Sequence, residues 1–344
     1  MGVAIGVDSH KSSLSAAAVD ELGRRLAVAS FANHPRGHQR ALEWIETFPE
    51  PVMIGIEGSQ RYGLPLARFL TTRGQQVAEV PATLTARERG RQRNQGKSDP
   101  VDACAIARVV IRGEGLSTAE RDSICVDLKL LSDWRDQLIH TRTRLANQTH
   151  KDLVILAPGY ERRVPNLVAA KHLAAALKLL RGLRSVRAQL VRRRIAELRR
   201  LDAEAARVRT EIEAKVAQSS TSLTKIHGVG SLAAARILGE VGDPRRIRSR
   251  AAFAAMSGTA PLEASSGSVR RHRLNRIGNR QLNRALYVIA LTQARSHPEA
   301  RRYLEKKLQE GKSRREGLRC LKRHLSNVVY RHLINDLRAA DNAA

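Results

Sequence analysis

The sequence has 344 residues, of which 61 are Lys or Arg and 33 are Asp or Glu, so its formal net charge is +28 at pH 7. A chain of this length can bury two or three hydrophobic cores, and a charge excess of this size calls for a polyanion as partner. Because only 3% of the residues are Phe, Trp or Tyr, a base-stacking platform is disfavoured, and we expect Arg and Lys contacts to phosphates instead.

The cysteine and hydropathy patterns bear on the compartment. Cys104, Cys125 and Cys320 are widely spaced and match neither a zinc pattern nor a disulfide framework. The N-terminal residues have no basic signal-peptide region, and no apolar run approaches the roughly 20 residues that a bilayer span needs. We therefore expect a cytoplasmic protein without a membrane partner.

The first 80 residues predict a mixed α/β sheet. Three short apolar runs come first and form a meander, and the later strands alternate with helices, which places helices on the faces of the sheet. The expected strands are 2–7, 14–19, 26–31, 51–56 and 76–80, and the expected helices are 35–48 and 62–73.

Four acidic residues stand at the ends of these elements. Asp8 and Glu57 each end an apolar strand, where an open α/β sheet places its site residues. Asp99 precedes Pro100 and is expected to cap a helix, and Asp102 follows on the same helical face, where a divalent cation can bridge two carboxylates. Each acid alone could be an ordinary cap or surface residue, but the set of four favours a metal site.

A long region rich in Leu, Ala and Arg follows. Helices are predicted over 128–156 and 168–216, with a break between them at Ala157-Pro158-Gly159 and Pro165. One interpretation is a coiled-coil arm that dimerises or grips nucleic acid through the arginines at 192–194 and 199–200. The other is an intramolecular helical hairpin with a solvated basic face.

The segment Ile226-His227-Gly228-Val229-Gly230 predicts the turn of a helix-hairpin-helix, with the second helix running through Ala233 and Ile237. Two glycines in such a hairpin expose backbone N–H groups that can bind a phosphate without reading its base. The alternative is a tight helix–helix turn that needs a glycine at positive φ.

A polar loop, Ser265-Ser266-Gly267-Ser268, precedes the basic run at 270–273. Serine beside glycine with cations nearby suits a nucleophile that attacks a phosphodiester, although the same residues are ordinary linker composition. Three predicted helices, at 281–296, 299–310 and 315–337, close this C-terminal region, and the tail has no fold signal.

Together these motifs resemble the DEDD transposases of bacterial insertion sequences. The segments that carry the resemblance are Val7-Asp8-Ser9-His10-Lys11, Ile56-Glu57-Gly58-Ser59, Lys97 to Ala103, Gly258-x-x-Pro261, Ser266-Gly267 and Leu274 to Arg280. The resemblance spans Val7 to about Leu333. It implies an RNase H-like (RuvC-like) mixed sheet with flanking helices at 1–116. A long helical or coiled-coil arm would follow at 117–218, and then an all-α transposase domain with a helix-hairpin-helix at 219–338 and a tail at 339–344.

The resemblance also implies the chemistry. Asp8, Glu57, Asp99 and Asp102 would hold Mg²⁺, or alternatively Mn²⁺, and Ser266, the serine before the glycine, would be the nucleophile. The spacing from this loop to Gly278 leaves Ser265 and Ser268 open as alternatives. The expected function is that of an insertion-sequence transposase, a recombinase that cuts and rejoins DNA strands.

The expected partners are double-stranded donor and target DNA and a bridge RNA that guides them, and the expected assembly is a homodimer or a dimer-of-dimers tetramer. Two rival functions remain open. One is a two-metal endonuclease or Holliday-junction resolvase in which water attacks the phosphate. The other is a non-catalytic DNA-binding protein built on the hairpin and the basic helices.

Overall fold

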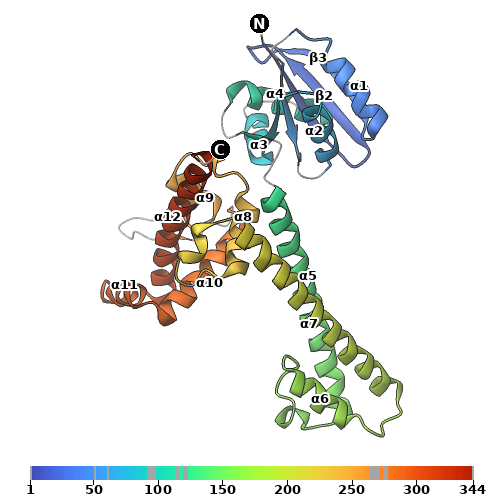
Figure 1. Ribbon diagram of the computed structural model, residues 1–344, viewed down its shortest axis with the longest axis vertical. Helices are drawn as coiled ribbons and strands as arrows, with labels where there is room; N and C mark the ends of the chain where they lie inside the picture. Colours follow the sequence, from blue (N-terminus) through green and yellow to red (C-terminus); the bar gives the residue numbers. More distant parts are fainter. Residues whose placement is uncertain are drawn as a thin grey trace. The chain divides into compact units, whose positions relative to one another are not determined.

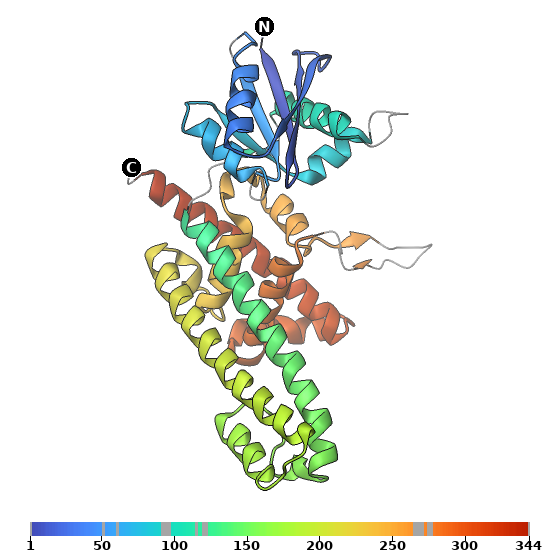
Figure 2. The same ribbon diagram turned by 90° about the vertical axis from the view of Figure 1, so that its right-hand side faces the viewer.

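A computed structural model of the protein describes residues 2–49, 52–59, 62–90, 98–113, 116–118, 123–263, 272–273 and 278–342. The chain divides into two compact units, which are traced in Figures 1 and 2. The sheet unit comprises Met1–Asp122 with Asp243–Ala252, and the helical unit comprises Ser123–Gly242 with Phe253–Ala344. Within the described ranges, no helix is both long enough and apolar enough to cross a lipid bilayer.

The sheet unit is built on a mixed sheet with the strand order β3-β2-β1-β4-β5-β6. The first three strands form an antiparallel meander, and β4 and β5 run parallel to β1, while the two-residue β6 pairs antiparallel with β5 at the edge. This confirms the expected mixed sheet. The strands are β1 Val3–Ser9, β2 Ser13–Val19, β3 Arg25–Ala32, β4 Val52–Glu57, β5 Val77–Val80 and β6 Ser117–Thr118.

Helices cover both faces of this sheet. Because side chains alternate along a strand, Ile5 and Val7 of β1 face one way and pack in a core with α1 and α2, whereas Ala4 faces the other way and packs against α4. The predicted helices at 35–48 and 62–73 are confirmed in shortened form. The helices are α1 Pro35–Ile45, α2 Leu64–Thr71, α3 Ala82–Arg89 and α4 Asp99–Arg112.

The helical unit begins with a hairpin of two long helices, α5 Ser123–Leu156 and α7 Val186–Gln218, which pack against each other within the chain (Figure 1). The prediction of one helix over 168–216 was wrong, because α6 Ala170–Leu179 ends before Gly182, which adopts φ 78°, and α7 starts afresh. Ser185 caps α7 by accepting a hydrogen bond from the Ala188 N–H.

Short helical elements continue the chain. Before the hairpin of 226–230 stands only a 3₁₀ turn at Ser222–Lys225, and after it comes α8 Ser231–Val241, so the first arm of the expected helix-hairpin-helix is a 3₁₀ turn. Three helices close the C-terminal region near their predicted positions. The remaining elements are a 3₁₀ turn at Pro244–Arg246, α9 Arg250–Met256, β7 Leu262–Glu263, β8 His272–Arg273, α10 Arg280–Ser296, α11 Pro298–Gln309 and α12 Arg314–Asp341.

Candidate metal centre and strand-transfer site

Two of the predicted acids lie side by side at the ends of neighbouring strands. β1 and β4 are parallel, and their register pairs Asp8 with Glu57 and, two residues earlier, Gly6 with Gly55. Residues two apart in a strand share a face, so the glycine pair and the acidic pair lie on the same face of the sheet. That face is the one that α4 covers.

The glycine pair allows α4 to approach the sheet closely. A Cβ atom at Gly6 would stand 2.2 Å from the Ala103 carbonyl oxygen and 2.3 Å from the Ala107 nitrogen, and a Cβ at Gly55 would stand 2.2 Å from a methyl carbon of Val110. Only glycine permits these contacts. Since Ala103 follows Asp102 directly, the close approach brings the start of α4 to the edge where Asp8 and Glu57 lie.

The start of α4 differs by one residue from the expectation. Ser98, not Asp99, is the N-cap, with an extended backbone, and Asp99 occupies the first helical position before Pro100. The reason is that proline is tolerated anywhere in the first turn, where its missing N–H costs no helical hydrogen bond. Asp99 and Asp102 both remain in the first turn, where the partial positive charge of the helix end favours carboxylates.

The described residues contain one set of three side chains that could together hold a metal ion, namely Asp8, His10 and Asp99, whose possible ligand atoms all lie within 4.8 Å of one another. The Nε2 atom of His10 stands 3.4 Å from Asp8 Oδ2 and 3.5 Å from Asp99 Oδ1. His10 thus joins the strand-end acid to the acid at the start of α4. The Ser9 hydroxyl, in between, donates to the Glu57 carbonyl oxygen at 2.7 Å and ties β1 to β4.

Glu57 and Asp102 lie near Asp8 but are not part of the set formed by Asp8, His10 and Asp99. Burial raises the pKa of Asp8, the neighbouring His10 lowers it, and the charges of Glu57, Asp102 and Asp99 raise it further. The carboxylates therefore repel one another across a short range. Asp102 is 7% exposed, and its Oδ1 accepts a hydrogen bond of 2.6 Å from the Arg89 guanidinium at the end of α3.

This donor set fits a divalent cation. Carboxylate oxygens are the ligands that Mg²⁺ and Mn²⁺ prefer. Because crowded, partly buried carboxylates are unfavourable when ionised, a bound cation would relieve their repulsion. Asp8 and Asp99 would supply ligand atoms, and His10 Nε2 contacts both of these carboxylates. Glu57 is paired with Asp8 in the strand register, and Asp102 is held by Arg89.

The predicted nucleophile Ser266 and its alternatives Ser265 and Ser268 lie outside the described residues, but the chain on both sides of their loop is described. A Cβ at Gly278 would stand 2.3 Å from the Gly258 nitrogen, so these two glycines pack backbone against backbone. The next amide, that of Asn279, donates to the Met256 carbonyl at 2.6 Å. The two ends of the loop therefore converge.

A buried polar chain supports the first of these ends. The Asn283 amide on α10 donates to the carbonyl oxygens of Ser257 at 2.9 Å and Gly258 at 3.0 Å. The Lys322 ammonium of α12, itself 5% exposed, donates to Asn283 Oδ1 at 2.8 Å. These hydrogen bonds fix the turn that leads toward the serine loop.

The hairpin of 226–230 is also held in place, by contacts with α10. Gly228 adopts φ 84°, and a Cβ there would stand 3.2 Å from the Thr292 side chain of α10. The Gln293 amide donates to the His227 carbonyl at 2.8 Å. Helix α8 begins directly after the hairpin, at Ser231. As in any α-helix, the N–H groups of its first turn have no hydrogen-bond partner within the helix.

Comparison with known protein families matches both halves of the chain. A model of DEDD transposases of the IS110 type, described as "Transposase", matches residues 5–158, and the model "Transposase IS116/IS110/IS902 family" matches residues 220–305. The chain belongs to the IS116/IS110/IS902 transposase family. The first match contains all four predicted acids, and the second contains the hairpin, the serine loop and α10.

Relatives in this family align with almost the whole chain. The uncharacterized 42 kDa protein of insertion element IS900 from Mycobacterium paratuberculosis is 24% identical over 94% of both chains. The uncharacterized 44.8 kDa protein of IS116 from Streptomyces clavuligerus is 25% identical over 95% of this chain and 93% of its own. Among solved structures, T. thermophilus RuvC in complex with a Holliday junction substrate is 19% identical over 31% of this chain and 90% of its own, with a TM-score of 0.25.

Two residues at the candidate metal centre were not predicted from the sequence. His10 stands two residues after Asp8, and that spacing along a strand end was the available signal. No pattern in the sequence indicated Arg89. Helix α3 has no apolar face, and the contact of Arg89 with Asp102 joins two different helices, α3 and α4.

Proposed function

We propose that this transposase cuts and rejoins DNA strands through Ser266 as nucleophile, assisted by a divalent-metal site made of Asp8, Glu57, Asp99 and Asp102. The observation that carries the proposal is the register pairing of Asp8 with Glu57 beneath the start of α4. Three separate segments bring carboxylates to one edge of the sheet, and crowding of this kind is unfavourable unless a cation is bound there.

Mg²⁺ is the proposed ion and Mn²⁺ the alternative. When bound, the ion would supply Lewis-acid stabilisation of the charge that develops on the phosphoryl oxygens. Asp8 and Asp99 would bind it directly, and His10 would hold the two carboxylates in position through its Nε2 contacts to both. Arg89, the last residue of α3, neutralises Asp102 and keeps that carboxylate oriented in the first turn of α4.

Ser266 is the proposed nucleophile, with Ser265 and Ser268 as alternatives. A serine that attacks a phosphodiester must be presented in a fixed position. The converging loop ends at Gly258 and Gly278, together with the support from Asn283 and Lys322, are consistent with this requirement. The rival resolvase mechanism, in which water attacks, would need the same acids but no serine.

The proposed partners are double-stranded donor and target DNA and a bridge RNA that guides them, in a homodimer or a dimer-of-dimers tetramer. The net charge of +28 supports backbone contacts by the protein while base pairing with a guide supplies sequence. We also propose a cytoplasmic location, which agrees with three cysteines that form no disulfide bond, two of them buried.

The metal site is tested by replacing each acid with its amide. Asp8→Asn, Glu57→Gln, Asp99→Asn and Asp102→Asn should each reduce Mg²⁺-dependent DNA cleavage to below detection, because each removes a charge from the cation's surroundings. Each variant should keep the wild-type circular dichroism spectrum. Glu43→Gln is the matched control, since Glu43 is exposed on α1 away from the strand ends, and it should cleave at the wild-type rate.

Isothermal titration with Mn²⁺ gives a readout apart from cleavage. The four amide variants should bind the ion more weakly than wild type, on the order of 10-fold or more. A variant of Asp102 that cleaves normally in Mg²⁺ would remove that residue from the proposed set. Normal cleavage by all four variants would contradict the metal site as a whole and favour a non-catalytic DNA-binding protein.

A further inference from the structure

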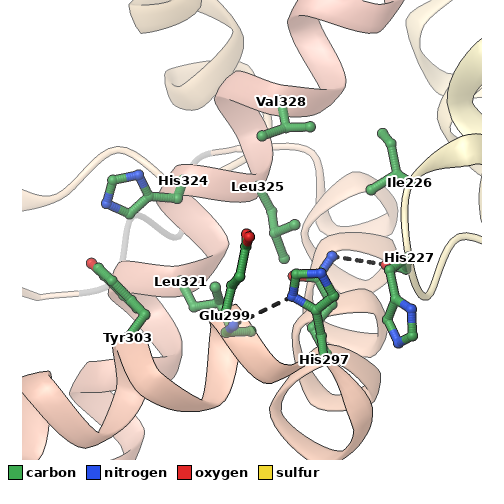
Figure 3. Close-up of a pocket in the computed structure, with 11 residues that line it drawn as sticks. Ile226, His227, His297, Glu299, Tyr303, Leu321, His324, Leu325 and Val328 are labelled. Carbon is green, nitrogen blue, oxygen red and sulfur yellow. Dashed lines mark hydrogen bonds between the residues drawn. The ribbon is translucent and has the colours of Figure 1, made fainter.

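The helical unit contains a pocket of about 410 Å³ bounded by the hairpin and by α10, α11 and α12 (Figure 3). This volume lies within the range typical of small-molecule sites. The apolar part of its lining includes Ile226, Leu321 and Leu325, all of them buried. Neither the proposed metal site nor the serine loop uses these residues.

Four side chains with aromatic rings line this pocket in two pairs. The rings of His227 and His297 have their centroids 5.0 Å apart, and those of Tyr303 and His324 are also 5.0 Å apart in an edge-on arrangement. Figure 3 shows the first pair on one side, the second pair on the other, and Leu321 between them. The overall aromatic content of 3% does not count imidazoles, so composition concealed this concentration of rings.

The first pair is held rigidly. His227 is fixed by a contact of 2.9 Å between its Nε2 atom and the Ser296 hydroxyl, and its carbonyl accepts the Gln293 amide. His297 caps α11, because its Nδ1 atom accepts the Ala300 N–H at 3.3 Å. Rings that are already ordered lose little entropy when a ligand stacks on them.

We infer that this pocket binds one unpaired base of a single DNA strand. Rings on two sides with an apolar floor suit a flat heterocycle, since any base can stack on such side chains. Glu299 is exposed at the pocket and can accept a hydrogen bond from a ring or amino N–H of the base. Apolar surface, which a base face would cover, comes from Ile226, Ala300, Leu321, Leu325 and Val328.

Exposed basic residues next to the pocket residues in the sequence can bind the phosphates on either side of such a base. Lys225 precedes Ile226, Arg301 and Arg302 lie between Ala300 and Tyr303, and all three cations are exposed. The first turn of α8 follows the hairpin and presents backbone N–H groups. DNA is favoured over RNA as the strand because the family consists of transposases, and the inference takes this one point from the proposed function.

The test measures binding of the full-length protein to a single-stranded DNA oligonucleotide that contains 2-aminopurine, whose fluorescence falls when the base stacks on a ring. Tyr303→Ala and His324→Ala should each weaken binding by roughly 5- to 150-fold and reduce the quenching. Because His324 is exposed, its replacement leaves the fold intact. Tyr303→Phe should keep both affinity and quenching, since it keeps the ring.

Tyr287→Ala is the matched control, because Tyr287 is an exposed tyrosine on α10 that does not line the pocket, and it should bind like wild type. Binding to duplex DNA of the same sequence should be unchanged in every variant. Unaltered single-strand binding by Tyr303→Ala and His324→Ala would overturn the inference, as would equal losses for duplex and single strand, or a loss confined to an RNA oligonucleotide. Asp8→Asn should bind the oligonucleotide normally, so a failure of the metal site would be distinguishable from a failure of this pocket.

Discussion

At the scale of single residues, Asp8 and Glu57 lie together because they end neighbouring parallel strands, and Arg89 holds Asp102 by a hydrogen bond. Asp8 and Glu57 were predictable because an acid that ends an apolar strand is a local signal. Arg89 was not, since its hydrogen bond to Asp102 depends on how α3 packs against α4. The capping error at Asp99 has a local cause, because Ser98 and Asp99 are both favoured at an N-cap.

Lys322 should make the free energy of unfolding depend on pH. Burial lowers its pKa, and the charge of Arg319 lowers it further, so the folded-state pKa lies below the ordinary value of 10.5. Between these two values the unfolded chain binds more protons, and the free energy of unfolding therefore rises with pH. Lys322→Met should remove this rise, while the exposed Lys306→Met should keep it.

The measurement is urea denaturation across a pH series that approaches 10.5. The free energy of unfolding of the wild type, minus that of Lys322→Met, should increase with pH near the upper end and stay level toward neutral pH. A difference that is constant over the whole series would mean that Lys322 titrates alike in the folded and unfolded chain.

At the scale of elements, hydrophobic periodicity located most helices and strands, and the failures have identifiable causes. The interruption between α6 and α7 was visible in Gly182 and Ser185, but the leucine spacing on either side concealed it. α3 has no apolar face, and β6 is only two residues long, so neither produced a periodic signal. The meander and the parallel strands were predictable because they are short apolar runs bounded by turns.

Gly6→Ala tests the packing of α4 on β1. The new methyl group would collide with the backbone of α4 at Ala103 and Ala107, which cannot move without displacing the start of the helix. We expect a loss of about 3 kcal/mol in the free energy of unfolding, measured by urea denaturation. Weaker Mn²⁺ binding should accompany it, since Asp99 and Asp102 would move with the helix.

Gly90→Ala is the control for this change. Gly90 has a helical φ of −62°, and a Cβ there would meet only ordinary contacts, at 3.5 Å from Arg87 O and 3.6 Å from Ala86 O. Its effect should stay within about 1 kcal/mol. If Gly6→Ala were as mild as Gly90→Ala, close approach of α4 would not be what assembles the acids.

At the scale of the whole molecule, the charge excess predicts how nucleic-acid binding depends on salt. If six or more phosphates are neutralised, affinity should fall on the order of a thousandfold over a fourfold rise in salt. Some arginines of α7 are paired within the chain, whereas others are exposed. Arg194 pairs with Asp152 and Arg192 donates to two carbonyls of the chain, whereas Arg193 and Arg199 are exposed.

Fluorescence anisotropy over a salt series checks this prediction. Arg193→Gln and Arg199→Gln should each reduce the slope of log affinity against log salt by about 1 and leave stability unchanged. Arg194→Gln should lower stability instead, because it leaves Asp152 with one fewer cation. A wild-type affinity that is flat in salt would show that the positive charge serves another purpose.

Strand transfer through a serine assisted by the acidic site can be tested by trapping the protein on its DNA and mapping the attachment residue by mass spectrometry. The full-length protein would be incubated with element-end DNA and bridge RNA in Mg²⁺ and then quenched with denaturant. We expect a covalent protein–DNA species attached at Ser266, which is absent from Ser266→Ala and Asp8→Asn but present in Ser265→Ala and Ser268→Ala. Cleaved DNA with free 5′-phosphate ends and no covalent species would contradict it.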